Sequence, residues 1–172
     1  MRTPKEWYQC MDAGTAAVRR PYRLAQFQQQ GFPRITLYHI PSFQDCTGWT
    51  VYQLPRSKDY LLQTVKWHQA ADGQRIEELM QGQVASTSAE PTLTEATTPL
   101  DAAWFERQLA ALSSIRVPLH TNRPTGLDGE SFGIHVWNEF EVEWWCEGPS
   151  EWRDLVRWAH DCIHHFQQST AA

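Results

Sequence analysis

Apolar and aromatic residues recur along the chain with two different periods, and these periods predict where strands and helices lie. Three consecutive segments are rich in β-branched and aromatic residues and are separated by Pro, Gly, Asp and Ser: "RITLYHI" (34–40), "GWTVYQL" (48–54) and "DYLLQTVKWHQ" (59–69). They predict three strands of an antiparallel meander. The next segment, "AADGQRIEELMQGQ" (70–83), fits neither period cleanly, and we predict a short helix there.

Proline, glycine and small polar residues predict where the chain turns or is exposed. Pro21 and Gly31 bracket the segment "PYRLAQFQQQG" as a helix start and a helix stop, which predicts a short helix over 21–30. Residues 82–98 are small, polar and of low complexity, so we expect an exposed connection there. The chain length of 172 residues fits one domain that contains this connection.

Two longer helices are predicted in the second half of the chain. Thr98 supplies an N-cap and Pro99 the first residue of a helix over 99–113. A second helix, over 149–167, starts at the Gly-Pro pair of "GPSEW". At 100° per residue the apolar residues of this last helix form one stripe: Trp152, Leu155, Val156, Ala159, Ile163 and Phe166.

The segment "SFGIHVWNEFEVEWWCEGP" (131–149) predicts a hairpin, and its register follows from the side-chain period of two. A two-residue loop would place Ile134 opposite Glu143 and mix charge into the apolar face. A three-residue loop over 137–139 instead keeps that face apolar, with the pairs Val136–Phe140, Ile134–Val142 and Phe132–Trp144. The other face then carries the pairs His135–Glu141, Gly133–Glu143 and Ser131–Trp145.

These elements predict an α+β fold in which an antiparallel sheet of about five or six strands packs against two main helices. The composition adds nine Trp, seven Phe and five Tyr. Much of the core is therefore expected to be aromatic, with some rings left at the surface or at an interface.

The cysteines and the absence of long apolar runs indicate the compartment. Four widely spaced cysteines form no C-x-x-C motif: Cys10, Cys46, Cys146 and Cys162. The start, "MRTPKEWYQC", lacks the apolar run of a signal peptide, and no segment approaches the ~18 apolar residues of a membrane span. We expect reduced, mostly buried thiols in a cytoplasmic protein that does not enter the membrane.

Charge is distributed unevenly along the chain. Residues 1–86 carry ten basic and seven acidic side chains, a net of +3, whereas residues 87–172 carry five and thirteen, a net of −8. Six of the acids lie between Glu139 and Asp154, against the single base Arg153. Such a surface disfavours nucleic acid and favours a basic protein partner, although it also fits a solvated face that keeps the protein soluble.

The outer face of the predicted hairpin is the best candidate for chemistry. His135 lies beside Glu141, with Glu143 on the same face, so these three side chains form the candidate catalytic or small-molecule site. Trp145 shares this face, and Trp158 projects away from the apolar stripe of the last helix. Glu141, Glu143, Trp145 and Trp158 together form the candidate ligand or partner surface.

The segment "WAHDCIHHF" (158–166) carries three histidines, but helix geometry separates them. His160 and His164 point the same way and are the one pair that can chelate a metal, without a visible third ligand, while Asp161 and His165 point to solvent. We therefore predict no metal site and no cofactor. No G-x-S-x-G motif or activated cysteine indicates a nucleophile, and Arg19, Arg20 and Arg23 are too few to indicate nucleic-acid binding.

Two segments of the second half resemble a type of uncharacterised bacterial protein: "GLDGESFG" (126–133) and "VEWWCEGPSEWRDLVRW" (142–158). The similarity covers about thirty residues, and "VKWHQAADGQRIEEL" upstream extends it. It implies a bacterial, cytosolic protein in which a turn, a strand and a capped helix pack as a unit. It carries no known activity or catalytic residue.

The charge asymmetry, the abundant aromatic residues and the missing catalytic motifs lead to one functional hypothesis. We expect a non-enzymatic interaction protein whose acidic, Trp-bearing second half binds a basic protein, as an immunity-type neutraliser of a basic toxin would. The alternative is a small-molecule-binding or hydrolase-like enzyme that uses His135, Glu141 and Glu143. A homodimer held by surface aromatic residues is a third hypothesis.

Overall fold

The computed structural model of the chain describes residues 5–21, 31–83, 90–118, 128–137 and 139–170. The helices are α1 (Lys5–Arg19), α2 (Gln69–Met80), α3 (Ala102–Ser114) and α4 (Arg153–Thr170), and a short 3-10 turn at Ser150–Trp152 leads into α4. The strands are β1 (Phe32–Pro41), β2 (Cys46–Gln53), β3 (Tyr60–Trp67), β4 (Leu93–Leu100), β5 (Glu130–Val136) and β6 (Phe140–Trp145).

The six strands form one antiparallel sheet in the order β4-β3-β2-β1-β5-β6. Strands β1, β2 and β3 form the predicted meander, because short connections return the chain directly beside itself. The β5–β6 hairpin pairs with the side of β1 that β2 leaves open. The predicted α+β fold, with an antiparallel sheet of five or six strands, is thereby confirmed.

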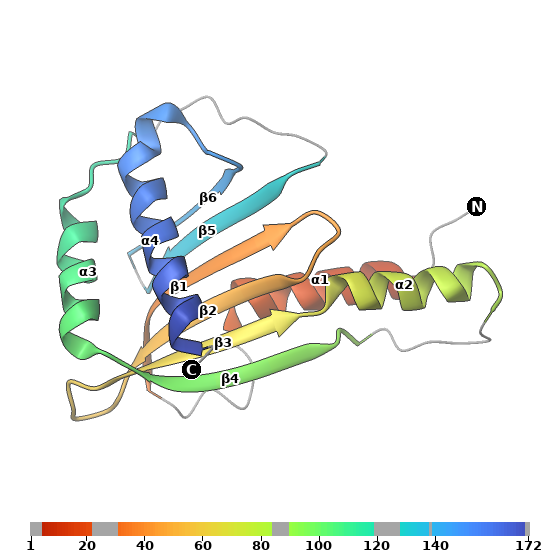
Figure 1. Cartoon of the computed structure of the whole chain (residues 1–172), viewed down its shortest axis with the longest axis horizontal. Coiled ribbons are helices and arrows are strands. Elements are labelled where there is room, and N and C mark those ends of the chain that lie inside the picture. Colours follow the sequence, from red (N-terminus) through yellow and green to blue (C-terminus); the bar gives the residue numbers. More distant parts are fainter. Residues whose placement is uncertain (1–4, 22–30, 84–89, 119–127, 138, 171–172) are drawn as a thin grey trace.

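Helices cover both faces of this sheet (Figure 1). Successive residues of a strand point to opposite faces. Leu37 therefore faces α3 and α4, whereas its neighbour Tyr38 faces α1 and α2. Figure 1 shows α3 and α4 side by side on one face and α1 beside α2 on the other. Both faces are covered, so six of the eight residues of β2 are buried.

The face under α3 and α4 holds the larger core. Every residue of the stripe predicted for the last helix is buried: Trp152, Leu155, Val156, Ala159, Ile163 and Phe166. Each fully buried side chain of this size contributes roughly 1.5–3 kcal/mol, so this stripe fixes α4 to the sheet. None of the helices within the described ranges is long and apolar enough to cross a membrane.

Helix α1 was not predicted from the sequence. Its buried residues include only one that is large and aliphatic, Val18; the others are Cys10, Gly14 and Ala17, so no wide apolar stripe marks the helix. Small residues let the helix backbone approach the sheet closely. A Cβ at Gly48 in β2 would lie 2.1 Å from the Val18 carbonyl oxygen, so only glycine fits there.

Strand β4 corrects two predictions. Residues 93–98, assigned to an exposed connection, belong to this strand, although most of their side chains are indeed exposed. Pro99 also lies in β4, where proline is tolerated because β4 is at the sheet edge and pairs with β3 alone. The helix predicted over 99–113 therefore begins later, and Asp101 rather than Thr98 caps it by accepting from the Ala103 and Trp104 amides.

Two further predictions concern short helices. The helix predicted over 70–83 is confirmed as α2. The helix predicted over 21–30 lies almost entirely outside the described residues. The last helix, predicted over 149–167, begins with the 3-10 turn at Ser150 and continues as α4 to Thr170.

Asp72 ties α2 to strands β3 and β4. Its carboxylate is 2% exposed and accepts from Trp67 Nε1 at 2.8 Å and from the Thr92 amide and hydroxyl at 2.8 and 2.7 Å. Burial alone would raise the pKa of Asp72, but hydrogen bonds from Thr92 and Trp67 and the nearby Arg75 outweigh it and lower the pKa. A lowered pKa in the folded state means that the ionised carboxylate stabilises the fold.

Gly48→Ala is expected to lower the free energy of unfolding by roughly 1–3 kcal/mol, because the added methyl pushes α1 away from the sheet. Urea unfolding followed by tryptophan fluorescence measures it. Gly73→Ala in α2 is the matched control: its Cβ would lie 3.7 Å from Trp7, an ordinary contact. That helical substitution should stabilise the protein by roughly 0.5–1 kcal/mol. Equal stability of Gly48→Ala and the wild type would contradict the close approach.

Asp72→Asn is expected to cost roughly 1.5–3 kcal/mol near neutral pH, because one amide NH₂ would then face hydrogen-bond donors. The carboxylate stabilises the fold fully above the usual carboxyl pKa of 3.8, and this contribution is lost as the pH falls below that value. Urea midpoints of the wild type and Asp72→Asn should therefore converge in acid. A gap that stays constant down to pH 2 would show that ionisation of Asp72 is not its origin.

Candidate functional site

The β5–β6 hairpin has the predicted register. All six pairs are present: Ser131–Trp145, Phe132–Trp144, Gly133–Glu143, Ile134–Val142, His135–Glu141 and Val136–Phe140. His135, Glu141, Glu143 and Trp145 therefore share the face of the hairpin that is turned toward the α1 side of the sheet. Within the predicted three-residue loop, Asn138 lies outside the described residues.

The acidic side chains of this face meet basic side chains of the same chain. Arg19 at the end of α1 binds Glu143 at 2.6 Å, and the adjacent Arg20 lies 3.4 Å from Glu141. The Arg19 guanidinium also stacks 5.3 Å from the ring centre of Tyr38. Part of the negative charge of the second half is thus neutralised by the first half. The third predicted arginine, Arg23, lies outside the described residues.

Tyr38 links this ion pair to the sheet. Its ring lies over Gly133, where a Cβ would come within 2.0 Å of the ring. Burial, followed by the neighbouring Glu143 carboxylate, raises the pKa of Tyr38, so its hydroxyl stays protonated at neutral pH. Glu143 is thereby held between a cation and a buried phenol, an arrangement that fixes the hairpin against β1.

The three candidate catalytic residues share a face but do not share a cavity. Glu141 lines a hollow of about 620 Å³ beside α1, together with Arg19 and Arg20. Neither His135 nor Glu143 lines that hollow. His135 is half-buried and its ring centre is 6.2 Å from that of Trp137. None of the three hollows described for this part of the chain is therefore lined by all three residues.

The two tryptophans of the predicted partner surface differ in exposure. Trp145 is half-buried against Gly129 on the outer face of the hairpin. Trp158 is only 7% exposed, because α3 covers it and its Nε1 donates to the Gln108 carbonyl oxygen at 3.1 Å. The placement of Trp158 at the surface was therefore wrong.

The histidines of α4 are spread around the helix as predicted, except for His165. His160 packs against Phe132, His164 is exposed beside Gln168, and His165 stacks on Trp104 with ring centres 3.8 Å apart rather than pointing to solvent. Among the described residues, no three His, Cys, Asp or Glu side chains gather closely enough to hold a metal ion.

Three of the four cysteines are poor nucleophiles at neutral pH. Cys10, Cys46 and Cys162 are buried and unpaired, and Cys146 is half-buried. Burial raises the pKa of Cys10 to about 11 and the pKa values of Cys46 and Cys162 to about 12. These three side chains are therefore thiols rather than reactive thiolates.

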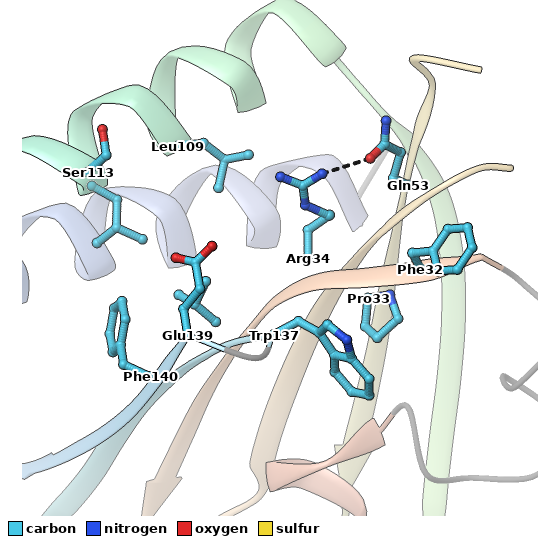
Figure 2. A pocket seen from close by; sticks show the side chains of 11 residues that line it. Phe32, Pro33, Arg34, Gln53, Leu109, Ser113, Trp137, Glu139 and Phe140 are labelled. Atoms are coloured by element: carbon cyan, nitrogen blue, oxygen red, sulfur yellow. Dashed lines mark hydrogen bonds between the residues drawn. The ribbon is translucent and has the colours of Figure 1, made fainter. Parts of the chain in front are cut away.

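A groove that sequence analysis missed lies at the end of the sheet where β1 begins. It has a volume of about 520 Å³ and runs between α3 and the tip of the β5–β6 hairpin. Phe32, Trp137 and Phe140 line it together with Leu109 and Ser113 of α3. In Figure 2 the ring of Phe140 points toward α3, whereas the ring of Trp137 points away from it. We call this groove the aromatic groove; its other lining residues are Pro33, Arg34, Gln53, Leu112, Val136 and Glu139.

The aromatic groove collects most of the exposed large apolar surface. Five large hydrophobic side chains are exposed in the described part of the chain, and three of them line this groove: Phe32 at 66%, Trp137 at 41% and Phe140 at 39%. Arg34 lies in the groove and donates to Gln53 Oε1 at 2.8 Å (Figure 2). Clustered exposed aromatic residues of this kind mark interaction sites rather than ordinary surface.

A second hollow of about 360 Å³ adjoins the first. Leu112 and Phe140 line both, so the two hollows lie next to each other at these side chains. Glu141 is the one charged residue that lines the second hollow; its other lining residues are Ile115, Val117, Pro118, Val142, Trp152 and Leu155.

The ion pair of Arg19 and Glu143 is expected to contribute more than that of Arg20 and Glu141, because it is shorter and packs on Tyr38. All four side chains are over one-third exposed, so both energies are small. Double-mutant cycles with alanine, measured by urea unfolding, should give a coupling of roughly 0.5–1 kcal/mol for the first pair and nearly zero for the second. Equal couplings would contradict this ranking.

Comparisons of the chain with models of protein families, with curated proteins and with solved structures find no match.

Proposed function

We propose that the chain is an interaction protein that binds an extended, apolar and basic segment of another protein in the aromatic groove. The observation that carries this proposal is the gathering of Phe32, Trp137 and Phe140, all exposed, around one groove. Grooves lined by aromatic side chains bind extended peptides, because rigid rings provide apolar contact area at a low cost in conformational entropy.

The shape of the groove suits an extended chain better than a compact ligand. Its two hollows adjoin at Leu112 and Phe140, so a segment that passes over these side chains can contact Trp137 in one hollow and Trp152 in the other. The walls belong to α3 and to the hairpin, which are fixed elements rather than long loops. Pre-formed walls lower the entropic cost of binding.

The charge at the rim of the groove favours a basic partner. Glu139 borders the first hollow and forms no ion pair with the residues that the structure describes. Glu141 borders the second, and its contact with Arg20 is long and solvent-exposed. Carboxylates at a rim speed association and select for basic residues more than they raise affinity. An immunity-type neutraliser of a basic toxin remains the biological role that fits this chemistry.

The hypothesis of a hydrolase-like or small-molecule site at His135, Glu141 and Glu143 has less support. Glu143 is engaged by Arg19, and His135 lines neither the hollow beside α1 nor the aromatic groove. A homodimer formed through the aromatic groove would also cover the exposed rings of Phe32, Trp137 and Phe140.

Selection of random peptides from a phage-displayed library against the full chain tests the proposal. The expected result is enrichment of sequences that combine aromatic or aliphatic residues with Lys or Arg. Replacing Trp137 and Phe140 together by Ser should weaken a selected peptide at least tenfold in isothermal titration, equivalent to about 1.4 kcal/mol. Glu139→Lys should remove the preference for basic residues and keep the preference for apolar ones.

Tyr8→Ser is the matched control, because Tyr8 is also exposed (59%) but lies on α1, away from the groove. Its peptide affinity should equal that of the wild type. Selection without enrichment would overturn the proposal, as would peptide binding that persists in the Trp137→Ser, Phe140→Ser variant. A dimer in sedimentation that dissociates in this variant would assign the groove to a second copy of the chain instead.

A further inference from the structure

A hydrogen-bonded chain of three side chains lies at the end of the sheet opposite the aromatic groove. His68, directly after β3, places Nδ1 at 3.1 Å from Asp45 Oδ2 and Nε2 at 2.7 Å from Thr94 Oγ1. Asp45 precedes β2 and Thr94 lies near the start of β4, so three adjacent strands bring these residues together. In Figure 1 this is the end marked by the arrowhead of β3.

The partners of His68 define its proton positions. Burial alone would raise the pKa of Asp45, but hydrogen bonds from Lys66 and His68 outweigh it and lower the pKa. Asp45 is therefore a carboxylate at neutral pH and can only accept, which places the imidazole proton on Nδ1. In the neutral imidazole, Nε2 then carries no proton and accepts from the Thr94 hydroxyl. A hydroxyl, a base within hydrogen-bond reach and a carboxylate that orients the base are the parts of a nucleophilic triad.

Lys66 adds a cation beside the Asp45 carboxylate. It lies directly opposite Thr94 in the β3–β4 register, so the two side chains share a face of the sheet. Its Nζ is 3.0 Å from Asp45 Oδ2, and its side chain is 46% exposed. The Lys66 ammonium therefore helps to keep Asp45 ionised, as the orienting carboxylate of the cluster must be.

The cluster is open to reagents. Thr94 is exposed, and the side chains of Asp45 and His68 are each 30% exposed. Strand β4 brings Thr94 beside His68. The sequence predicted an exposed connection over residues 82–98 instead of this strand, so it gave no reason to expect that these two side chains meet. No motif marks the three residues, which are separated by 23 and 26 positions.

We propose that Thr94, His68 and Asp45 form a nucleophilic site that accepts the acyl group of a small activated ester. Thr94 Oγ1 attacks the carbonyl carbon, its proton passes to His68 Nε2, and the carbonyl oxygen takes the negative charge of the tetrahedral intermediate. The bond to the leaving alcohol then breaks, and that alcohol takes the proton from His68. Water hydrolyses the Thr94 ester by the same steps in reverse, which releases the acid and restores the hydroxyl.

Reaction of the full chain with p-nitrophenyl acetate tests this site. Release of p-nitrophenol is followed by absorbance, and the acetylated residue is located by peptide mass spectrometry. We expect acetylation of Thr94 that falls at least tenfold in His68→Gln and Asp45→Asn and is absent in Thr94→Val. Thr94→Ser should remain reactive, because it retains the hydroxyl and removes a crowding methyl group.

His39→Gln is the matched control, because His39 also contacts a carboxylate, Glu130, at 2.7 Å. In the His39→Gln variant, Thr94 should be acetylated at the same rate as in the wild type. Absence of an acetyl group on Thr94 in wild-type protein quenched with acid during the reaction, together with p-nitrophenol release no faster than that of Thr94→Val, would overturn the proposal. Release of p-nitrophenol that is undiminished in Thr94→Val, or Thr94 labelling unchanged in His68→Gln, would overturn it too. Circular dichroism melting of each variant separates a loss of reactivity from a loss of fold.

Discussion

Burial of aromatic side chains on both faces of one sheet is the constraint on which the rest of the structure depends. Trp49 points toward α3 and α4, whereas Tyr52 and Trp67 point toward α1 and α2, and each is at most 2% exposed. Helices must therefore cover both faces, and α1 reaches its face only where Gly48 leaves room for its backbone. Because α1 packs on β1, β2 and β3, the outer face of the hairpin stays half-open and is tied down by Arg19 instead.

The parts of the fold that follow from local periodicity could be predicted. The register of the hairpin was fixed by one requirement, that Ile134 and Val142 share an apolar face, and a slip by one residue would have buried Glu143. The stripe of α4 followed from the same reasoning at a period of 3.6. In both elements one face is buried, so placing a polar residue on that face would be energetically costly. The spacing of apolar residues therefore predicts which side chains are buried.

The parts that depend on distant partners could not be predicted. Strand β4 is exposed along most of its length, so its residues show no apolar alternation, and only pairing with β3 makes it a strand. Trp158 lies outside the apolar stripe of its own helix and is buried because α3 happens to cover it. The distribution of charge along the sequence likewise contains no information on tertiary contacts. It therefore could not predict that Glu141 and Glu143 are neutralised by arginines more than a hundred residues away.

The antiparallel order also separates the two candidate sites. Phe32 begins β1, Gln53 ends β2 and Phe140 begins β6, so the aromatic groove lies at one end of the sheet. Asp45 and Thr94 lie where β2 and β4 begin, which is the opposite end in an antiparallel arrangement. A packed sheet lies between these sites and they share no residue, so substitutions at one should act independently of the other. Peptide binding and acyl transfer can therefore succeed or fail separately, and neither outcome bears on the other.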